Sequence, residues 1–401
     1  MKITGIIAEY NPFHNGHKYH LEKARELTGC DYLIIVMSGD YTQRGTPAIY
    51  SKYARANAAL LSGADLVLEM PVFGSVASAP DFAACGVNTL EATGICDYLF
   101  FGSESGDLAS LHMQANAFYT ESEEISSKIK SGLKSGLSWP DARANAFGES
   151  NTVASLPNDI LGIEYLLALK KINSPIIPVT IKRNDPGYHS EEKKGTFASA
   201  TAARKAILEN DLNFLQDVLP DELFQSLLSI PCPPVTFDDC SLLLCEKLLT
   251  TPLEQLLQVS GMPTDLARKL HKHKLEFHSA AQLISERKDR NYTYTRLNRC
   301  LLNTMLGITK SDTAIFKEYS STPWLRILGF RKESTPLLSQ LKKHTITPLI
   351  TKTADYSSIL SGECLTLFEK HLQTAELYRL LSQLKSGKSS KNEFTNSIII
   401  V

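Results

Sequence analysis

Five short, nearly continuous apolar runs restrict the fold of this chain more than any other feature. They are "ITGIIA" (3–8), "YLIIVM" (32–37), "DLVLEM" (65–70), "DYLFFG" (97–102) and "PIIPVT" (175–180). A strand that is apolar on both faces is typical of a parallel sheet covered by helices on both sides. Helical patterns alternate with the runs, over residues 17–28, 51–63, 76–93, 105–148 and 158–172. The alternation predicts an α/β fold with a doubly wound parallel sheet, whose ligands bind at the carboxyl ends of the strands.

The strand signal almost disappears after "SATAARKAILEN" (199–210), and the remaining segments have helical periodicity. "PCPPV" (231–235) predicts a break in helix or a hinge, and "WLRILGF" (324–330) is compatible with one short strand. The 401 residues exceed one ordinary core. We therefore expect two domains, residues 1–212 and a mostly helical 213–401. The last residues, 385–401, are compatible either with a docked segment or with a frayed end.

Composition indicates an ordinary globular protein of the cytoplasm. Hydrophobic residues make up 43% and charged residues 21% of the chain. The eight cysteines are scattered without CxxC pairs, which indicates reduced thiols, and no residue spacing predicts a metal site. No export signal and no apolar run of about 18 residues is present, so we expect no membrane span.

The turn after the first apolar run carries an unusual set of residues. "NPFHNGH" (11–17) places His14, Gly16 and His17 where a helix begins. Such a helix N-terminus binds anions because unpaired N–H groups and the positive end of the helix dipole point the same way. Two imidazoles there can stabilise the negative charge that develops on a phosphate during displacement, and Gly16 lets the backbone approach it closely. The alternative is that the two histidines are plain polar caps of the helix.

"NPFHNGH" resembles the HxGH signature of the nucleotidyltransferase superfamily, which includes nicotinate mononucleotide adenylyltransferases and class I aminoacyl-tRNA synthetases. The resemblance implies a Rossmann-like nucleotidyltransferase domain in which His14 and His17 are catalytic. They would contact the ATP phosphates and favour attack on the α-phosphorus, with pyrophosphate leaving. A Ser/Thr-rich turn that opens a late helix usually completes such a site, and "ASATAAR" (198–204) fits it. By itself that turn is only a helix cap.

Further stretches resemble one family, the tRNA(Met) cytidine acetate ligases. They are "SGDYTQRGTPAIYSKYAR" (38–55), "GADLVLEMPV" (63–72), "FGSESG" (101–106), "PNDILGIEY" (157–165) and "IKRND" (181–185), with a looser likeness over 292–308 and 324–330. The resemblance implies that acetate attacks ATP to give acetyl-adenylate and pyrophosphate. The acetyl group then passes to the exocyclic amine of the wobble cytidine of elongator tRNA(Met), giving N4-acetylcytidine. ATP with Mg²⁺, acetate and this tRNA are thus expected, with no membrane and no obligate protein partner.

The resemblance also implies a set of ATP-binding residues. They are Ile7, Ala8, Glu9, Tyr10, Asn11, Pro12, Phe13, His14, Asn15, Gly16, His17, Lys18, Tyr19, His20, Gly102, Asn158, Arg183, Ser199, Thr201 and Arg204. Gly102 would leave an adenine edge open to the backbone, and Arg183 could fork onto phosphate or ribose. The sequence leaves the roles of Gln43, Arg44 and Lys52 open; Arg44 could meet phosphate, acetate or tRNA.

The second half of the chain is basic where the first is acidic. Residues 1–210 hold 19 Lys and Arg against 23 Asp and Glu, whereas residues 261–345 hold 16 against 7. The expected tRNA-binding residues lie here and are Arg287, Lys288, Arg290, Arg296 and Arg299. Tyr292 and Tyr294 between them suit stacking on unpaired bases. The alternative is a solvated helix face.

Two other functions remain open on the sequence alone. One is adenylyl transfer to a small cofactor precursor such as a pyridine mononucleotide, which would need only about the first 210 residues. The other is an RNA-binding protein that has lost activity, against which the intact His14, Gly16 and His17 argue.

Overall fold

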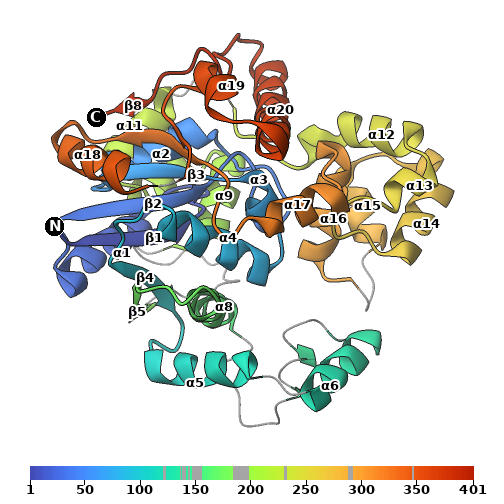
Figure 1. Cartoon of the computed structure of the whole chain (residues 1–401). Helices are drawn as coiled ribbons and strands as arrows, with labels where there is room; N and C mark the ends of the chain where they lie inside the picture. Colours follow the sequence, from blue (N-terminus) through green and yellow to red (C-terminus); the bar gives the residue numbers. More distant parts are fainter. Residues whose placement is uncertain are drawn as a thin grey trace.

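One sheet of eight strands organises the chain in the computed structural model (Figure 1). The structure describes all residues except 121–122, 136, 138–140, 143–144, 147–155, 184–197, 230–232, 288–291 and 346. The strand order is β5-β4-β1-β2-β3-β6-β7, with β8 paired to β6. The strands of the first half are β1 (Ile3–Ala8), β2 (Tyr32–Ser38), β3 (Leu66–Met70), β4 (Tyr98–Ser103) and β5 (Ile177–Lys182). All five predicted strands are confirmed, and they are parallel to one another.

Helices cover both faces of this sheet, as the continuous apolar runs predict. The helices of the first half are α1 (Asn15–Thr28), α2 (Lys52–Leu61), α3 (Val72–Ser75), α4 (Ala79–Glu91), α5 (Leu108–Tyr119), α6 (Glu123–Lys134) and α8 (Pro157–Lys171). Along β2, Leu33 and Ile35 pack with α1 and α2, whereas Ile34 and Val36 pack with α4 and α8 on the other face. The prediction of a doubly wound α/β sheet is therefore confirmed.

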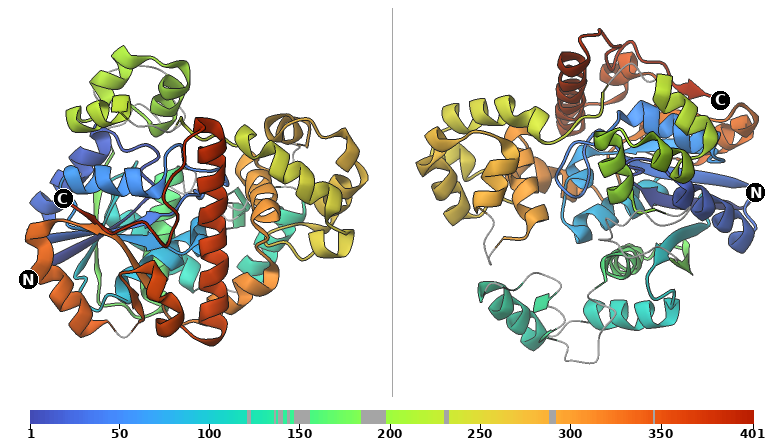
Figure 2. Two further views of the ribbon diagram at one scale, coloured as in Figure 1. Left: turned by 90° about the horizontal axis from the view of Figure 1, so that it is seen from above. Right: turned by 180° about the vertical axis from the view of Figure 1, so that it is seen from behind.

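The second half of the chain is mostly helical, as predicted. Its helices are α9 (Ala200–Glu209), α10 (Leu212–Val218), α11 (Asp221–Ser229), α12 (Ser241–Thr250), α13 (Leu253–Leu256), α14 (Thr264–Lys272), α15 (Ala280–Arg287), α16 (Tyr294–Leu306), α17 (Lys310–Glu318), α18 (Thr335–His344), α19 (Tyr356–Ile359) and α20 (Gly362–Ser386). Helix α20 stands between the sheet and α12–α16 (Figure 2). None of the helices among the described residues is long and apolar enough to cross a membrane. Residues 231 and 232 of the expected hinge lie outside the described part of the chain.

The sheet crosses the expected boundary between residues 212 and 213. Strand β6 (Leu325–Phe330) confirms the short strand expected there, and it pairs antiparallel with β3. Strands β7 (Leu349–Ile350) and β8 (Ile399–Ile400) then pair with β6. Residues 325–401 thus complete the sheet of the first half rather than a separate second domain. The chain end is docked, because the N–H of Val401 donates to the carbonyl oxygen of Phe330 and the carbonyl oxygen of Val401 accepts the N–H of Lys332.

A buried cluster of charged side chains links strand β6 to the rest of the sheet. Lys52 is fully buried, and its Nζ lies 2.9 Å from Glu69 Oε1 and 2.9 Å from Glu393 Oε2. Arg326 of β6 donates to the same two carboxylates, at 2.8 and 2.5 Å. Each charge is paired, which is the condition under which buried ions are tolerated. Lys52, whose role the sequence leaves open, is therefore a structural residue of the core. It does not line the pocket at the carboxyl ends of β1, β4 and β5.

Candidate active site

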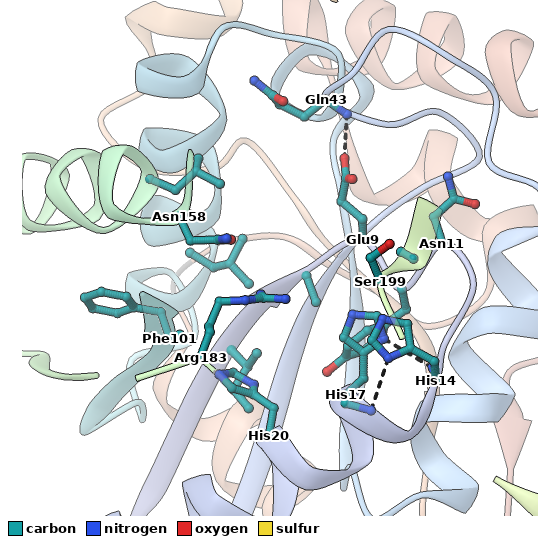
Figure 3. A pocket seen from close by; sticks show the side chains of 18 of the residues that line it. Glu9, Asn11, His14, His17, His20, Gln43, Phe101, Asn158, Arg183 and Ser199 are labelled. Carbon is teal, nitrogen blue, oxygen red and sulfur yellow. Dashed lines mark hydrogen bonds between the residues drawn. The ribbon is translucent and has the colours of Figure 1, made fainter. Parts of the chain in front are cut away.

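A pocket opens at the carboxyl ends of β1, β4 and β5, between the N-termini of α1, α8 and α9 (Figure 3). Sixteen of the expected ATP-binding residues line it. They are Ile7, Ala8, Glu9, Tyr10, Asn11, His14, Gly16, His17, Tyr19, His20, Gly102, Asn158, Arg183, Ser199, Thr201 and Arg204. The fold thus brings together five segments, at residues 7–20, 102, 158, 183 and 199–204, as expected of the carboxyl edge of a doubly wound sheet.

The two histidines of the HxGH turn are stacked on each other and cap α1. Their ring centroids lie 3.7 Å apart. Gly16 N donates to Nδ1 of His14 at 3.1 Å, and His14 N donates to Nδ1 of His17 at 3.3 Å. The expected catalytic role and the alternative role of helix caps are therefore not exclusive, because each cap uses only one ring nitrogen.

These caps decide where each imidazole carries its hydrogen. A nitrogen that accepts a backbone N–H bond has no hydrogen of its own, so the neutral rings of His14 and His17 are protonated at Nε2. Burial holds the pKa of His17 well below its ordinary value of 6.5, and His14, Arg183 and His20 act in the same direction. His17 is thus a neutral Nε2–H donor at neutral pH.

The N-terminus of α9 lies against the HxGH turn. Ser199 caps α9 by accepting the Ala202 N–H at 3.1 Å. Arg204 donates to the carbonyl oxygen of Asn11 at 2.6 Å and to Thr201 Oγ1 at 3.0 Å. Arg204 therefore joins the late helix to the first turn, so that two helix N-termini share one end of the pocket.

The other end of the pocket is built by β4, β5 and the start of α8. The side chain of Arg183 passes over Gly102, where an added Cβ would lie 3.0 Å from Arg183 Cγ. Asn158 lines this end, and its Nδ2 donates to Glu104 Oε1 at 2.7 Å. Figure 3 shows Asn158, Arg183 and Phe101 on this side and His14, His17 and Ser199 on the opposite side.

Four residues that the resemblance places in the ATP site do not line the pocket. Phe13 is buried in the core next to His17, with ring centroids 5.5 Å apart, and supports that ring from behind. Pro12 is buried, and Asn15 points to α10, where Nδ2 donates to Asp217 O at 3.0 Å. Lys18 follows on α1, beyond the turn. A continuous run of residues around a turn points in all directions, so only part of it can face one ligand.

Other lining residues were not expected, or were expected without a role. Gln43 and Arg44 belong to the lining, and Gln43 N donates to Glu9 Oε1 at 2.6 Å. Phe101 and Tyr165 also line the pocket and pack edge to face, with centroids 5.6 Å apart. Both rings lie within apolar runs, where the sequence offers no signal that separates a pocket wall from core.

The expected tRNA-binding residues are only partly described. Lys288 and Arg290 lie outside the described residues, and of Arg287 the structure describes the backbone at the end of α15. Arg296 is exposed on α16, whereas Arg299 is half-buried and donates from Nη1 to Gln43 O at 3.1 Å.

The expectation that Tyr292 stacks on an unpaired base is wrong for this structure. Its side chain is 6% exposed and its hydroxyl donates to Asp265. Arg296 covers the ring, with Cζ 5.5 Å from the ring centroid. Tyr294 is 51% exposed and keeps an accessible face.

No group of three or more His, Cys, Asp or Glu that could hold a metal ion occurs among the residues that the structure describes. Within the described part of the chain, Glu9 is the one acidic side chain that lines the pocket. The described site thus offers an ion few protein ligands.

Known proteins match the chain over its whole length. The family model for HIGH Nucleotidyl Transferase matches residues 1–393. The tRNA(Met) cytidine acetate ligase of Acetivibrio thermocellus is 36% identical over 416 aligned residues and covers 100% of both chains. That of Thermoanaerobacter sp. (strain X514) is 40% identical over 390 residues, 95% of each chain. The crystal structure of apo Thermotoga maritima TmcAL superposes with a TM-score of 0.94 at 30% identity, and the form bound with alpha-thio ATP with 0.92 at 30%, both over 100% of both chains.

Proposed function

The chain belongs to the HIGH nucleotidyl transferase family and to the tRNA(Met) cytidine acetate ligases within it, and on this basis we propose that it activates acetate with ATP and acetylates tRNA(Met). In the first step an acetate oxygen attacks the α-phosphorus of ATP and pyrophosphate leaves, which gives acetyl-adenylate. In the second step the exocyclic amine of the wobble cytidine attacks the acetyl carbon. AMP leaves and the amine loses a proton, which gives N4-acetylcytidine.

The observation that carries this proposal is the stacked pair His14 and His17 facing the N-terminus of α9. Both rings are Nε2–H donors, held in place by backbone bonds to Nδ1. Ser199 and Thr201 line the same end of the pocket. Donors fixed in advance stabilise the charge that forms on phosphate oxygens in the transition state without reorganising.

The caps of the three helices also suggest how ATP lies in the pocket. Helices α1 and α9 are capped by an imidazole and a hydroxyl group, which leave their positive ends available to an anion. The first N–H groups of α8 are instead bonded to the carboxylate of Glu104. Phosphates would be repelled there, so we place the triphosphate at α1 and α9 and the base near Gly102 and Asn158.

Magnesium would enter with ATP as part of the substrate. Mg²⁺ is commonly bound through substrate phosphates together with one or two carboxylates. Glu9 is the carboxylate of the described pocket that could take part. The chemistry that such an ion supplies is neutralisation of phosphate charge.

The tRNA would approach across α16 and the loop between β2 and α2. Exposed Arg296 and Tyr294 on α16 suit a phosphate contact and a stacked base. Arg299 of α16 donates a hydrogen bond to Gln43, and Gln43 lines the pocket in which we place ATP. Helix α16 is therefore adjacent to that pocket.

Pyrophosphate exchange into ATP tests the activation step. With acetate the protein should catalyse exchange, and His14→Ala or His17→Ala should lower the rate at least 100-fold, about 2.7 kcal/mol of transition-state stabilisation. Lys18→Ala is the matched control, because Lys18 lies on the same helix outside the pocket lining. Exchange with a pyridine mononucleotide in place of acetate would mean a small-molecule adenylyltransferase. Absence of exchange with both, while tRNA still binds, would mean an RNA-binding protein.

A further inference from the structure

One carboxylate ties the loop after β4 to the start of α8. Glu104 Oε1 accepts the backbone N–H of Asn158 at 3.1 Å and its side-chain Nδ2 at 2.7 Å. Glu104 Oε2 accepts the backbone N–H of Asp159 at 2.8 Å. All three partners are N–H donors, so this carboxylate acts only as an acceptor.

These contacts determine which way the side-chain amide of Asn158 faces. The two ends of an amide differ, because the nitrogen donates and the oxygen accepts. A carboxylate accepts only, so the Nδ2 of Asn158 must face Glu104 and the Oδ1 must face away from it. Asn158 and Arg183 both line the base end of the pocket, and Figure 3 shows them on the same side of it. The Oδ1 is therefore the acceptor that this amide can offer to a ligand in the pocket.

An acceptor at this position distinguishes adenine from guanine. Adenine carries an amino group at C6, which donates, whereas guanine carries an oxygen there, which accepts. Oδ1 of Asn158 can bond to the amino group but would meet the guanine oxygen as a second acceptor, and an unpaired polar group in a pocket is costly. We propose that Glu104 is a positioning residue that fixes the Asn158 amide and thereby sets the preference for ATP over GTP. This inference rests on the proposed ATP-dependent activation.

A second set of hydrogen bonds, which does not involve Asn158, also holds this loop. Ser105 donates to Asp159 Oδ1 from its backbone N at 3.2 Å and from its hydroxyl at 2.9 Å. The Gly106 N–H bonds to Ser103 Oγ at 3.0 Å. A change at Glu104 thus leaves other bonds between the loop and α8, which makes it a usable test.

The first test replaces Glu104 by glutamine. The new Nε2 must face either the Asp159 N–H or the Asn158 amide. In the second arrangement the Asn158 amide turns its Oδ1 toward position 104 and its Nδ2 toward the pocket, so glutamine no longer holds this amide in one orientation. We expect acetate-dependent pyrophosphate exchange in Glu104→Gln to lose at least tenfold in the ratio of kcat/KM for ATP to that for GTP. Both nucleotides are measured on the same protein, so a general loss of folded enzyme does not move the ratio.

The second test restores the acceptor. In the double variant Glu104→Gln with Asn158→Asp, the aspartate can accept from the new Nε2 and still present an oxygen to the pocket. We expect the double variant to regain at least tenfold in the ATP to GTP ratio over Glu104→Gln. Ser105→Ala is the control, since it removes the hydroxyl bonds of the same loop to Asp159 and Asp107 without contacting Asn158, and its ratio should stay at that of the parent protein.

Three results would overturn the inference: a parent protein that uses ATP and GTP equally, an unchanged ratio in Glu104→Gln, or an equal change in Ser105→Ala. Failure of the proposed function is distinguishable from these results, because the parent protein would then show no acetate-dependent exchange with either nucleotide.

Discussion

Gly45 packs directly against the backbone of Arg299. A Cβ built on Gly45 would lie 2.7 Å from the carbonyl carbon of Asn298 and closer still to the nitrogen of Arg299, and the φ of Gly45 is +78°. The loop that holds Gly45 also holds Gln43, which bonds to Glu9 on one side and to Arg299 on the other. Gln43 and Gly45 of this loop therefore connect the pocket to helix α16.

Gly45→Ala should separate the loop from α16. A non-glycine residue at positive φ costs roughly 1 to 2 kcal/mol, and the overlap with the α16 backbone adds to this. We expect a larger loss in the free energy of unfolding, measured by urea denaturation, than in the control Gly29→Ala. Gly29 has a φ of +60°, but nothing lies within 4 Å of its Cβ position. Equal losses in the two variants would mean that the contact with α16 is loose.

Arg296 and Arg299 should respond differently to charge reversal. Arg296 is exposed, so Arg296→Glu should weaken tRNA binding and reduce its salt dependence by about one counterion. Its stability should fall by no more than about 1 kcal/mol, the loss of its contact with the Tyr292 ring. Arg299→Glu should destabilise the protein as well, since burial already lowers the pKa of Arg299 and a carboxylate there would meet the Gln43 carbonyl. Filter binding at two salt concentrations and thermal unfolding separate the two effects. A loss of stability in Arg296→Glu that exceeds this contact with Tyr292 would contradict its placement on the surface.

Gly102→Ala should weaken ATP binding through Arg183. The added Cβ would lie 3.0 Å from Cγ and 3.5 Å from Cδ of Arg183, so the arginine must move. We expect the KM for ATP to rise about tenfold, roughly 1.4 kcal/mol, with a smaller change in kcat. The double variant Gly102→Ala with Arg183→Ala should be no worse than Arg183→Ala, because the displaced group is then absent. Additive losses would show that Gly102 acts on the nucleotide without Arg183.

His17 should make the free protein less stable in mild acid. Its folded pKa lies well below 6.5, first through burial and then through His14, Arg183 and His20. Between the unfolded and the folded pKa the unfolded chain binds the additional proton. The free energy of unfolding therefore falls as the pH drops below about 6.5, by at most about 1.4 kcal/mol per pH unit from this group.

His17→Gln removes this dependence while keeping a side chain that can accept a hydrogen bond. Denaturant unfolding at pH 7.5 and 5.5 should show a larger loss in the parent protein than in the variant. The same loss in both proteins would contradict a depressed pKa for His17.

Glu393→Gln should destabilise the fold far from the pocket. Glu393 Oε2 lies 2.9 Å from Lys52 and 2.5 Å from Arg326, and loss of its charge leaves two buried cations with one fewer partner. Removing one member of a buried pair costs about 3 to 5 kcal/mol. Lys391→Gln, an exposed change in the same segment, should cost less than about 0.5 kcal/mol. Urea midpoints compare the two, and equal midpoints would mean that the tail does not stabilise the sheet.

Short-range residue patterns in the sequence predict the buried strands, the HxGH turn and the cap of α9. The run around Ile34 and Val36 is apolar at every position because both faces of β2 are covered. The HxGH turn is recognisable because His14 and His17 are three residues apart on one helix start. Ser199 precedes a helical pattern in the sequence, which predicts a helix cap, and it caps α9.

Contacts between residues that lie far apart in the sequence produce no short-range pattern from which they could be predicted. Lys52 looks like any basic residue at a helix start, and its burial follows from Glu69 and Glu393, which lie 17 and 341 positions away in the sequence. The sequence does not reveal the burial of Tyr292 for the same reason, since its hydroxyl donates to Asp265 of helix α14. Gln43 is held at the pocket by the hydrogen bond from its backbone N–H to Glu9. Almost any residue type could make this bond, so the sequence does not reveal it.

The antiparallel pairing of β3 with β6 has a consequence for synthesis of the chain. Leu66 pairs with Phe330, so β3 has a free edge until residue 330 has left the ribosome. At about 5 to 20 residues per second this interval lasts roughly 10 to 50 s. An uncovered strand of buried apolar residues is a template for pairing with other chains. The nascent nucleotide-binding half is therefore the stage at which a chaperone would be needed most, and the stage at which a truncated product would aggregate.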